Sequence, residues 1–421
     1  MPHRIRRVKS VLLVVLLLTF PFIAGRAEEI TFLYMNQSGY DPADILDRAD
    51  AFRQLTGVRV KPVFVEYKDR YALVTETARK TLPEFDLILL DLIWTADFAR
   101  HGIIVPLPDP LDRAVRSGMV PRIYSAFDYE GRLWAMPFHV DFQMLYTNMD
   151  LLTNAGFSSP PRTLEEMTRM ARAARDKGLI KYPIFDSWNE QEVLVCEFTW
   201  LTGAFGGSLT DGSGRISCTT GPCLEALEFM TGLLKQGLMN PYSLDAEENF
   251  TSEVFQAGDC LFTTNWLWLI RLLGGAGKPA GPRWAVSPIP VSESAPAAAG
   301  STTSVSGFEG LAVMARSAHK DAAWRFARYL DSPEFQGRHL EFMPAWKEVW
   351  DWPGTRRGDP LLSAKQRQID GLRDRPVHPL YAKISAVLQR WIYRALSGTA
   401  TPREALEEAQ RAIDVIGGRT P

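Results

Sequence analysis

Three apolar, strand-like runs separated by two helical patterns open the main part of the chain. The runs are Ile30–Met35, Val58–Val65 and Phe85–Asp91, and the first helical pattern stops at Gly57 while the second spans 69–80. Nearly continuous apolar strands of this kind are typical of a parallel sheet covered by helices on both faces. Because parallel strands need long crossover connections, which these helical segments supply, the succession predicts an α/β fold.

Polar and aromatic residues follow each of these strands. In parallel α/β sheets, ligands bind beyond the carboxyl ends of the strands. The residues placed there are therefore candidate ligand contacts: Asn36, Gln37 and Tyr40 after the first strand, Glu66 and Tyr67 after the second, and Asp91 and Trp94 after the third.

The first 27 residues carry a targeting pattern. Arg and Lys residues precede an apolar run from Val11 to Ala24, and small residues and two acidic residues follow it. This run, of about fourteen residues, is short for a bilayer span. We predict a signal peptide cleaved after Ala27. No Cys lies near that position, so we expect a soluble exported protein without a lipid anchor, as suits a Gram-negative periplasm.

Composition and motifs narrow the function. The 421 residues are 46% hydrophobic and 23% charged with a net charge of −2, which indicates a globular chain long enough for two lobes and gives no electrostatic reason to expect nucleic acid. The sequence has no His-Glu-x-x-His, Gly-x-Ser-x-Gly or phosphate-loop motif. We therefore expect no enzymatic activity, metal or cofactor. A pair of carboxylates that cleaves glycosidic bonds remains an alternative, because the fold and not the spacing would join such a pair.

The chain has four cysteines, at positions 196, 218, 223 and 260. An even number permits two disulfides in an oxidising compartment. In "CTTGPC" the Gly-Pro pair would let Cys218 and Cys223 close a small loop, which makes them disulfide candidates. Cys260 lies in a strand-like run that is also consistent with a buried thiol.

Asp141 interrupts the apolar run "PFHVDFQMLY" together with His139. Removing an ionised carboxylate from water without a partner costs several kcal/mol or more. A carboxylate here needs a reason: a helix cap, an arginine partner or a ligand are the alternatives.

Four segments in this order carry a resemblance to a known family: "FDLILLDLIWTADFARHGIIVPL", "YEGRLWAMPFHVDFQMLYTNMDLLTNAGFSSPPRTLEEM", "FQAGDCLFTTNWLW" and "HKDAAWRFARYLDSPEFQ". The chain resembles the extracellular solute-binding proteins of ABC importers, in the sugar-binding group (family 1) that includes the maltose-binding protein. The resemblance implies an α/β, two-lobed periplasmic-binding-protein fold (type II), with a ligand cleft between lobes joined by a hinge. We expect a signal peptide over 1–27, an N-terminal lobe of 28–138 plus 267–315, and a C-terminal lobe of 139–266 plus 316–421.

The same resemblance implies ligand contacts. Asp141 falls on the first crossing between lobes, where sugar hydroxyls would satisfy a carboxylate when the lobes close. Trp268 resembles a stacking platform, and Trp266 is the competing ring. Tyr381 is the candidate substitute where the maltose-binding protein has a further Trp and this chain aligns Ser385. The other implied contacts are Asp91, Trp94, Glu197, Asn265, Gly307, Phe308 and Glu309.

These features predict the substrate-binding component of an ABC sugar importer. It would capture a mono- or oligosaccharide as a monomer and deliver it to the transmembrane subunits of a permease. Aromatic rings suit the apolar faces of a sugar, and Asp, Glu, Asn and Gln suit its hydroxyls. A non-sugar solute, such as a polyol, a phosphorylated polyol or a polyamine, remains an alternative.

Overall fold

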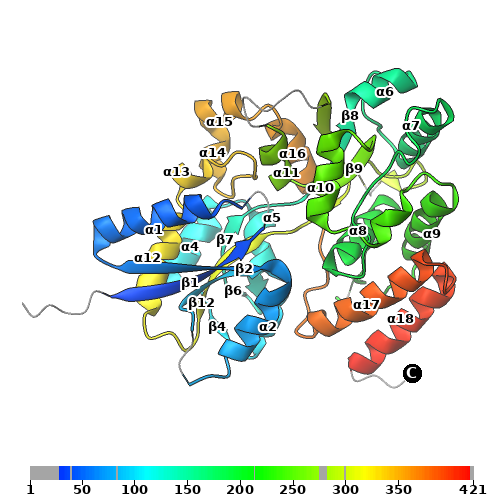
Figure 1. The fold of residues 1–421 in the computed structure, drawn as a ribbon. Helices are drawn as coiled ribbons and strands as arrows, with labels where there is room; N and C mark the ends of the chain where they lie inside the picture. Colours follow the sequence, from blue (N-terminus) through cyan, green and yellow to red (C-terminus); the bar gives the residue numbers. More distant parts are fainter. Residues whose placement is uncertain are drawn as a thin grey trace, which may run out of the picture.

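The computed structural model describes residues 28–37, 40–81, 84–212, 214–274, 282–297 and 300–417. The chain forms two α/β lobes, each with its own sheet, and the short helices α13–α16 lie beside both (Figure 1). These helices span Pro333–Gln336, Lys347–Asp351, Pro353–Gly358 and Leu362–Asp370. The predicted signal peptide lies outside the described residues. Within the described ranges, none of the helices combines the length and the apolar character that a bilayer crossing needs.

The first lobe is built on the predicted parallel strands. β1 (Glu29–Asn36) lies between β2 (Arg59–Glu66) and β3 (Leu87–Asp91), parallel to both. The first connection is α1 (Pro42–Thr56), which ends at Gly57 in the left-handed region at φ 77°. The second is α2 (Tyr67–Thr77). Pattern and structure agree here because the apolar strands and helix stops are local signals.

Distant segments complete this sheet. β12 (Glu309–Met314) runs antiparallel to β3, and β4 (Ile104–Val105) and β7 (Met136–His139) both pair with it. α12 (Lys320–Leu330) packs on α1 and β12, where Phe326 meets Phe32 and Phe52. The remaining α-helices and strands before β8 are α3 (Thr95–Arg100), α4 (Asp109–Gly118), α5 (Pro121–Tyr124), β5 (Asp128–Tyr129) and β6 (Arg132–Leu133).

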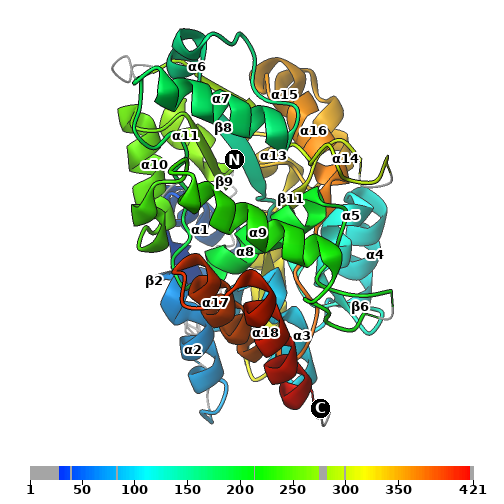
Figure 2. The same cartoon turned by 90° about the vertical axis from the view of Figure 1, so that its right-hand side faces the viewer.

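The second lobe has a three-stranded antiparallel sheet among its described residues, in the order β10 (Trp284–Ser287), β8 (Gln143–Asn148), β9 (Phe262–Trp266). Four helices that pack against one another cover one side, as Figure 2 shows: α8 (Glu192–Ala204), α9 (Gly221–Lys235), α17 (Tyr381–Leu396) and α18 (Pro402–Ile416). A capping box formed by Thr401 and Glu404 opens α18. The other helices of this half are α6 (Met149–Ala155), α7 (Leu164–Asp176), α10 (Glu248–Ala257) and α11 (Trp268–Leu273).

Three segments cross between the lobes side by side: 139–143, 304–309 and 371–380. β11 (Ser304–Val305) pairs in parallel with β13 (Leu372–Arg373). The Gly307 N–H donates to the carbonyl of Asp141 at 3.0 Å. The crossings are thus hydrogen-bonded to one another and form a single hinge.

The expected division into lobes needs two corrections. Residues 268–273 and 284–287, expected in the N-terminal lobe, form α11 and β10 of the second half, where β10 pairs with β8. Residues 320–330, expected in the C-terminal lobe, form α12 on the first lobe. In both cases contacts between residues distant in the sequence decide to which lobe the segment belongs, and the segment's own sequence pattern does not indicate it.

The disulfide expectation is also wrong in this structure. Cys218 and Cys223 are free, buried thiols, as are the other two cysteines. Gly221 and Pro222 open helix α9 and do not form a reverse turn, so the loop that was to join the two sulfurs is absent. The Cys218 thiol instead donates to the Leu406 carbonyl of α18 at 3.6 Å.

Candidate functional site

A cleft lies between the two lobes next to the hinge. Its inner part spans about 440 Å³ when the space open to solvent is included. Both lobes and the crossings contribute to the lining. Its residues are Met35, Gln37, Tyr40, Tyr67, Asp91, Asp141, Glu192, Val193, Cys196, Glu248, Trp266, Trp268, Gly307, Glu309 and Arg375.

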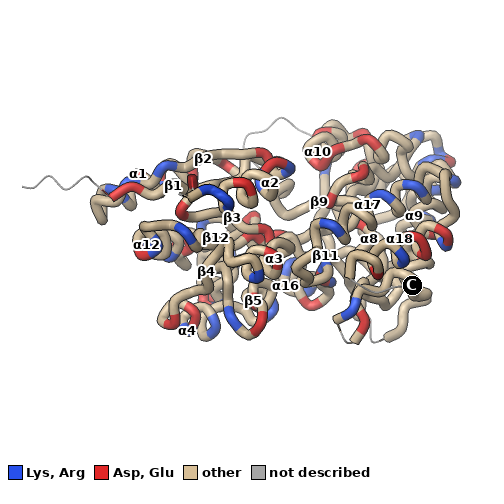
Figure 3. Tube along the Cα trace, turned by 90° about the horizontal axis from the view of Figure 1, so that it is seen from below, with Lys and Arg blue, Asp and Glu red and all other residues tan. Residues whose placement is uncertain are grey.

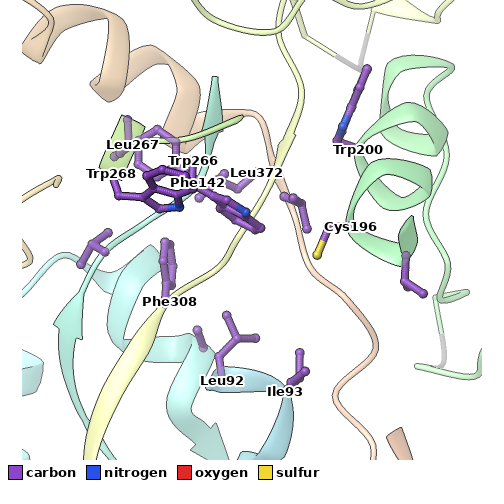
Figure 4. Close-up of a cluster of buried hydrophobic side chains, with 14 of the residues drawn as sticks. Leu92, Ile93, Phe142, Cys196, Trp200, Trp266, Leu267, Trp268, Phe308 and Leu372 are labelled. Atoms are coloured by element: carbon purple, nitrogen blue, oxygen red, sulfur yellow. The ribbon is translucent and has the colours of Figure 1, made fainter. Parts of the chain in front are cut away.

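Two indole rings form the apolar wall. Trp266 ends β9 and Trp268 begins α11, and Figure 4 shows both in a cluster with Phe142, close to Phe308. A Cβ at Gly307 would lie 2.3 Å from Cζ3 of Trp266, so only glycine lets this ring rest on the hinge. Trp268 is fully buried, yet its indole N–H has no hydrogen-bond partner among the described residues. That donor lacks an acceptor that a ligand oxygen would supply.

Asp141 lies at the hinge end of the cleft and is 2% exposed. Its carboxylate accepts the Leu267 N–H at 2.7 Å and the Tyr40 hydroxyl at 3.3 Å. Burial raises the pKa of Asp141 to about 8, and these hydrogen bonds oppose the rise. No described cation pairs with it. The arginine partner considered from the sequence is therefore excluded within the described residues. The helix-cap alternative is supported, because Leu267 is the N-cap residue of α11, and Asp141 also lines the cleft.

The first-lobe wall carries two carboxylates held by arginine. Arg70 is fully buried and makes a bidentate contact to Glu309, at 2.6 and 3.1 Å. Burial raises the pKa of Glu309 to about 7, while the guanidinium acts in the opposite direction. Asp91 ends β3, caps the following turn through the Ile93 N–H, and accepts the Tyr67 hydroxyl at 2.8 Å.

Three charged residues of the inner cleft, Glu192, Glu248 and Arg375, are absent from the predicted set. Arg375, on the third crossing, contacts Glu192 at 2.8 Å and Asp91 at 3.5 Å, and thereby joins the lobes. Glu248 begins α10 and accepts the indole N–H of Trp266. Burial raises the pKa of Glu248 to about 7. In the sequence, Glu248 has the position of an ordinary acidic first-turn residue, and Arg375 lies in a Pro-flanked polar stretch typical of a surface loop.

The cleft opens outward between β2, α8 and α10. Asn36 lies in this mouth and donates to Glu66 at 2.5 Å. The mouth and the inner cleft are continuous, because both are lined by Gln37, Tyr67, Glu192, Val193 and Glu248. The residues that only the mouth contributes are Asn36, Glu66, Lys68, Ser187, Gln191, Glu247 and Asn249.

Five predicted contacts are not among the residues that line the cleft. Trp94 stacks behind Tyr67, and the side chain of Asn265 donates to Thr251. Phe308 is fully buried beneath the rings. Tyr381 and Ser385 of α17 both donate to Glu192 and so support a lining residue from behind.

Glu197 is the fifth of these residues, and it points into the second lobe. It accepts from Gln143 at 2.8 Å, from Trp200 and from Thr264. Burial and the nearby Asp186 raise its pKa. Its expected contact with ligand is therefore replaced by an internal role, because α8 turns this carboxylate toward the sheet.

Comparison with known proteins identifies the class. Residues 47–349 match the model of the bacterial extracellular solute-binding proteins, and the chain belongs to this family. A probable ABC transporter-binding protein of Deinococcus radiodurans is 26% identical over 96% of this chain and 98% of its own length. Maltose-bound MalE3 of T. maritima has a TM-score of 0.84 and 23% identity, over 92% of this chain and all of that one. A solute-binding protein of Agrobacterium radiobacter in complex with ribitol has a TM-score of 0.80 and 21% identity, over 92% and 98%. The two-lobed periplasmic-binding-protein fold is thus confirmed.

Proposed function

We propose that this protein is the exported substrate-binding component of an ABC importer for a mono- or oligosaccharide. The family, the naming of the Deinococcus relative and the maltose and ribitol held by the structural neighbours support this proposal. The protein acts as a monomer in the periplasm after loss of residues 1–27. Its partners are the sugar and the transmembrane subunits of a permease.

One observation carries the proposal. Trp266 and Trp268 lie in the same cleft as Asp141, Glu248 and other hydrogen-bonding side chains. A sugar presents apolar C–H faces to such rings and a rim of hydroxyls to such acceptors. The alternative of a phosphorylated polyol is disfavoured, because acidic side chains outnumber basic ones along the whole cleft.

The hinge couples binding to closure. Glu248 and Trp266 come from the second lobe, Tyr67 and Asp91 from the first, and Asp141 from a crossing. A ligand that contacts the first lobe, the second lobe and the crossing segment makes its full set of contacts only when the two lobes approach each other. Such a ligand favours the closed form by its differential affinity for that form, and the closed form is what the permease would recognise.

Thermal unfolding of the exported protein tests this function. The panel consists of mono-, di- and trisaccharides, polyols, phosphorylated polyols and polyamines. A ligand present at a hundredfold its Kd adds about 2.7 kcal/mol to stability. We expect one sugar to raise the unfolding midpoint, and Trp266→Phe, which removes the indole donor, to weaken that effect.

Glu253→Gln is the matched control, because Glu253 lies on α10 but is exposed outside the cleft. A shift from a phosphorylated polyol or polyamine with none from any sugar would reject the sugar proposal. Chromatography of the sugar after incubation tests the enzymatic alternative, which requires cleavage products.

A further inference from the structure

The cleft is acidic although the outer surface is not. Lys and Arg alternate with Asp and Glu along the outer helices of both lobes (Figure 3). Two cations line the described cleft, Arg375 and Lys68, and Arg70 lies behind its wall. Against them stand seven lining carboxylates: Glu66, Asp91, Asp141, Glu192, Glu247, Glu248 and Glu309.

Both buried arginines are already engaged. Arg70 is bound by Glu309, and Arg375 lies between Glu192 and Asp91. Asp141 and Glu248 are left with neutral donors: a backbone N–H and a tyrosine hydroxyl for the first, an indole N–H for the second. Both line the inner cleft, and after burial the Glu248 charge also contributes to the raised pKa of Asp141. Neither carboxylate forms an ion pair with a described residue, although the charge of Arg375 partly opposes the raised pKa of Glu248.

A metal ion does not explain this arrangement. No group of three or more His, Cys, Asp or Glu in the described ranges is placed to hold one. An ammonium group on the ligand would supply the missing charge through charge-assisted hydrogen bonds, which are about twice as strong as neutral ones.

A second observation narrows the ligand further. The buried Trp268 indole N–H and the Arg375 Nε–H, both in residues that line the cleft, have no acceptor among the described residues. An ammonium has only donors and leaves these groups unsatisfied, whereas a hydroxyl or ring oxygen satisfies them. The site therefore requires a ligand that carries both a cation and acceptor oxygens.

We propose that the preferred substrate is a basic saccharide, an amino sugar or an oligosaccharide of amino sugars, whose ammonium group binds between Asp141 and Glu248. This inference rests on the proposed function and specifies its substrate class. The ring faces pack on Trp266 and Trp268, and the hydroxyls accept from Trp268 and Arg375.

Isothermal titration calorimetry with matched ligand pairs tests it. The pairs are glucosamine with glucose, galactosamine with galactose, and the β-1,4-linked glucosamine disaccharide with cellobiose, at pH 7 in low salt. In at least one pair we expect the amine to bind with a Kd at least about tenfold lower than its neutral partner. Glu248→Gln keeps an acceptor for Trp266 and should bring that ratio near one, as should Asp141→Asn. Glu253→Gln should leave it unchanged.

The contrary results are separable. Equal or tighter binding of the neutral partners would overturn the amine preference and leave the sugar-binding function standing. If 1,4-diaminobutane bound as tightly as the amino sugars, both the amino-sugar preference and the sugar-binding function would be overturned, because this diamine has no hydroxyl groups. If no saccharide bound, either in the thermal-unfolding panel or in the calorimetric pairs, both the proposed function and this inference would be rejected.

Discussion

The two walls of the cleft solve the problem of buried charge in opposite ways. On the first lobe, Glu309 is held by a guanidinium that is itself fully buried. At the hinge and on the second lobe, Asp141 and Glu248 face neutral donors only. Breaking a buried ion pair is expensive, whereas neutralising an unpaired buried carboxylate relieves desolvation. The first wall is therefore a fixed support, and the second is where a ligand can change the electrostatics.

The largest effect should come from making the first wall resemble the second. Arg70→Met leaves Glu309 without its cation, and we expect a loss of about 3–5 kcal/mol in the free energy of unfolding. Urea denaturation of the ligand-free protein measures this loss. Arg70→Met combined with Glu309→Gln should recover part of it, because no unpaired carboxylate then remains. A loss below about 1 kcal/mol would mean that the pair does not support the wall.

The pH dependence of stability sharpens the comparison. Burial raises the pKa of Asp141 to about 8 and the pKa values of Glu248 and Glu309 to about 7, above their unfolded values, so their contribution to stability is lost as the pH rises through these values. We expect the free energy of unfolding to fall by about 1–2 kcal/mol between pH 6.5 and 8.5. His139 has a lowered pKa and so weakens the fold only as the pH falls below about 6.5, outside this window. Urea titrations at fixed pH steps provide the measurement.

Neutralising the unpaired site should have a smaller effect, opposite in sign to that of Arg70→Met. In Asp141→Asn the side-chain oxygen can still accept the Leu267 N–H. We expect stability at pH 8 to be unchanged or raised by up to about 1 kcal/mol, and the pH slope between 6.5 and 8.5 to be reduced. Clear destabilisation at pH 8 would show that the Asp141 charge is needed by the hinge itself.

The smallest effect concerns a pair outside both walls. Arg271 of α11 contacts Asp41 and Asp44 at the start of α1, at 3.1 and 2.9 Å, and is one-third exposed. Exposed pairs of this kind contribute about 0–1 kcal/mol and are screened by salt. Arg271→Gln should therefore lower the unfolding midpoint slightly in low salt and not at all in 1 M NaCl. A large fall in the unfolding midpoint that does not depend on salt would mean that the Arg271 contacts stabilise the fold about as much as the Arg70 contact with Glu309.

The sequence predicts the strands and caps of this fold better than their assembly. β1 to β3 and the capping box at Thr401 follow from local patterns. β12 joins the same sheet although it lies more than two hundred residues further along the chain than β3. No pattern in its own sequence indicates that β3 is its partner.

The residues of the candidate site also divide into those that the sequence predicts and those whose position depends on the assembled fold. Asp91 stands out because a strand ends there and Asp141 because it interrupts an apolar run, whereas Trp268 follows from the family resemblance. All three line the cleft. Glu197 lies on a helix whose rotation decides between cleft and core, and its apolar neighbours could not fix that rotation. Arg375 lies in a crossing whose sequence reads as a surface loop.

The contact between Trp266 and Gly307 has a practical consequence. The indole rests on the backbone of a crossing and at the same time lines the cleft. Ligand occupancy and rotation of the lobes therefore both alter the surroundings of one chromophore. The native chain thus contains a built-in optical reporter: the intensity and emission maximum of Trp266 should follow loading of the cleft in real time, without an attached dye.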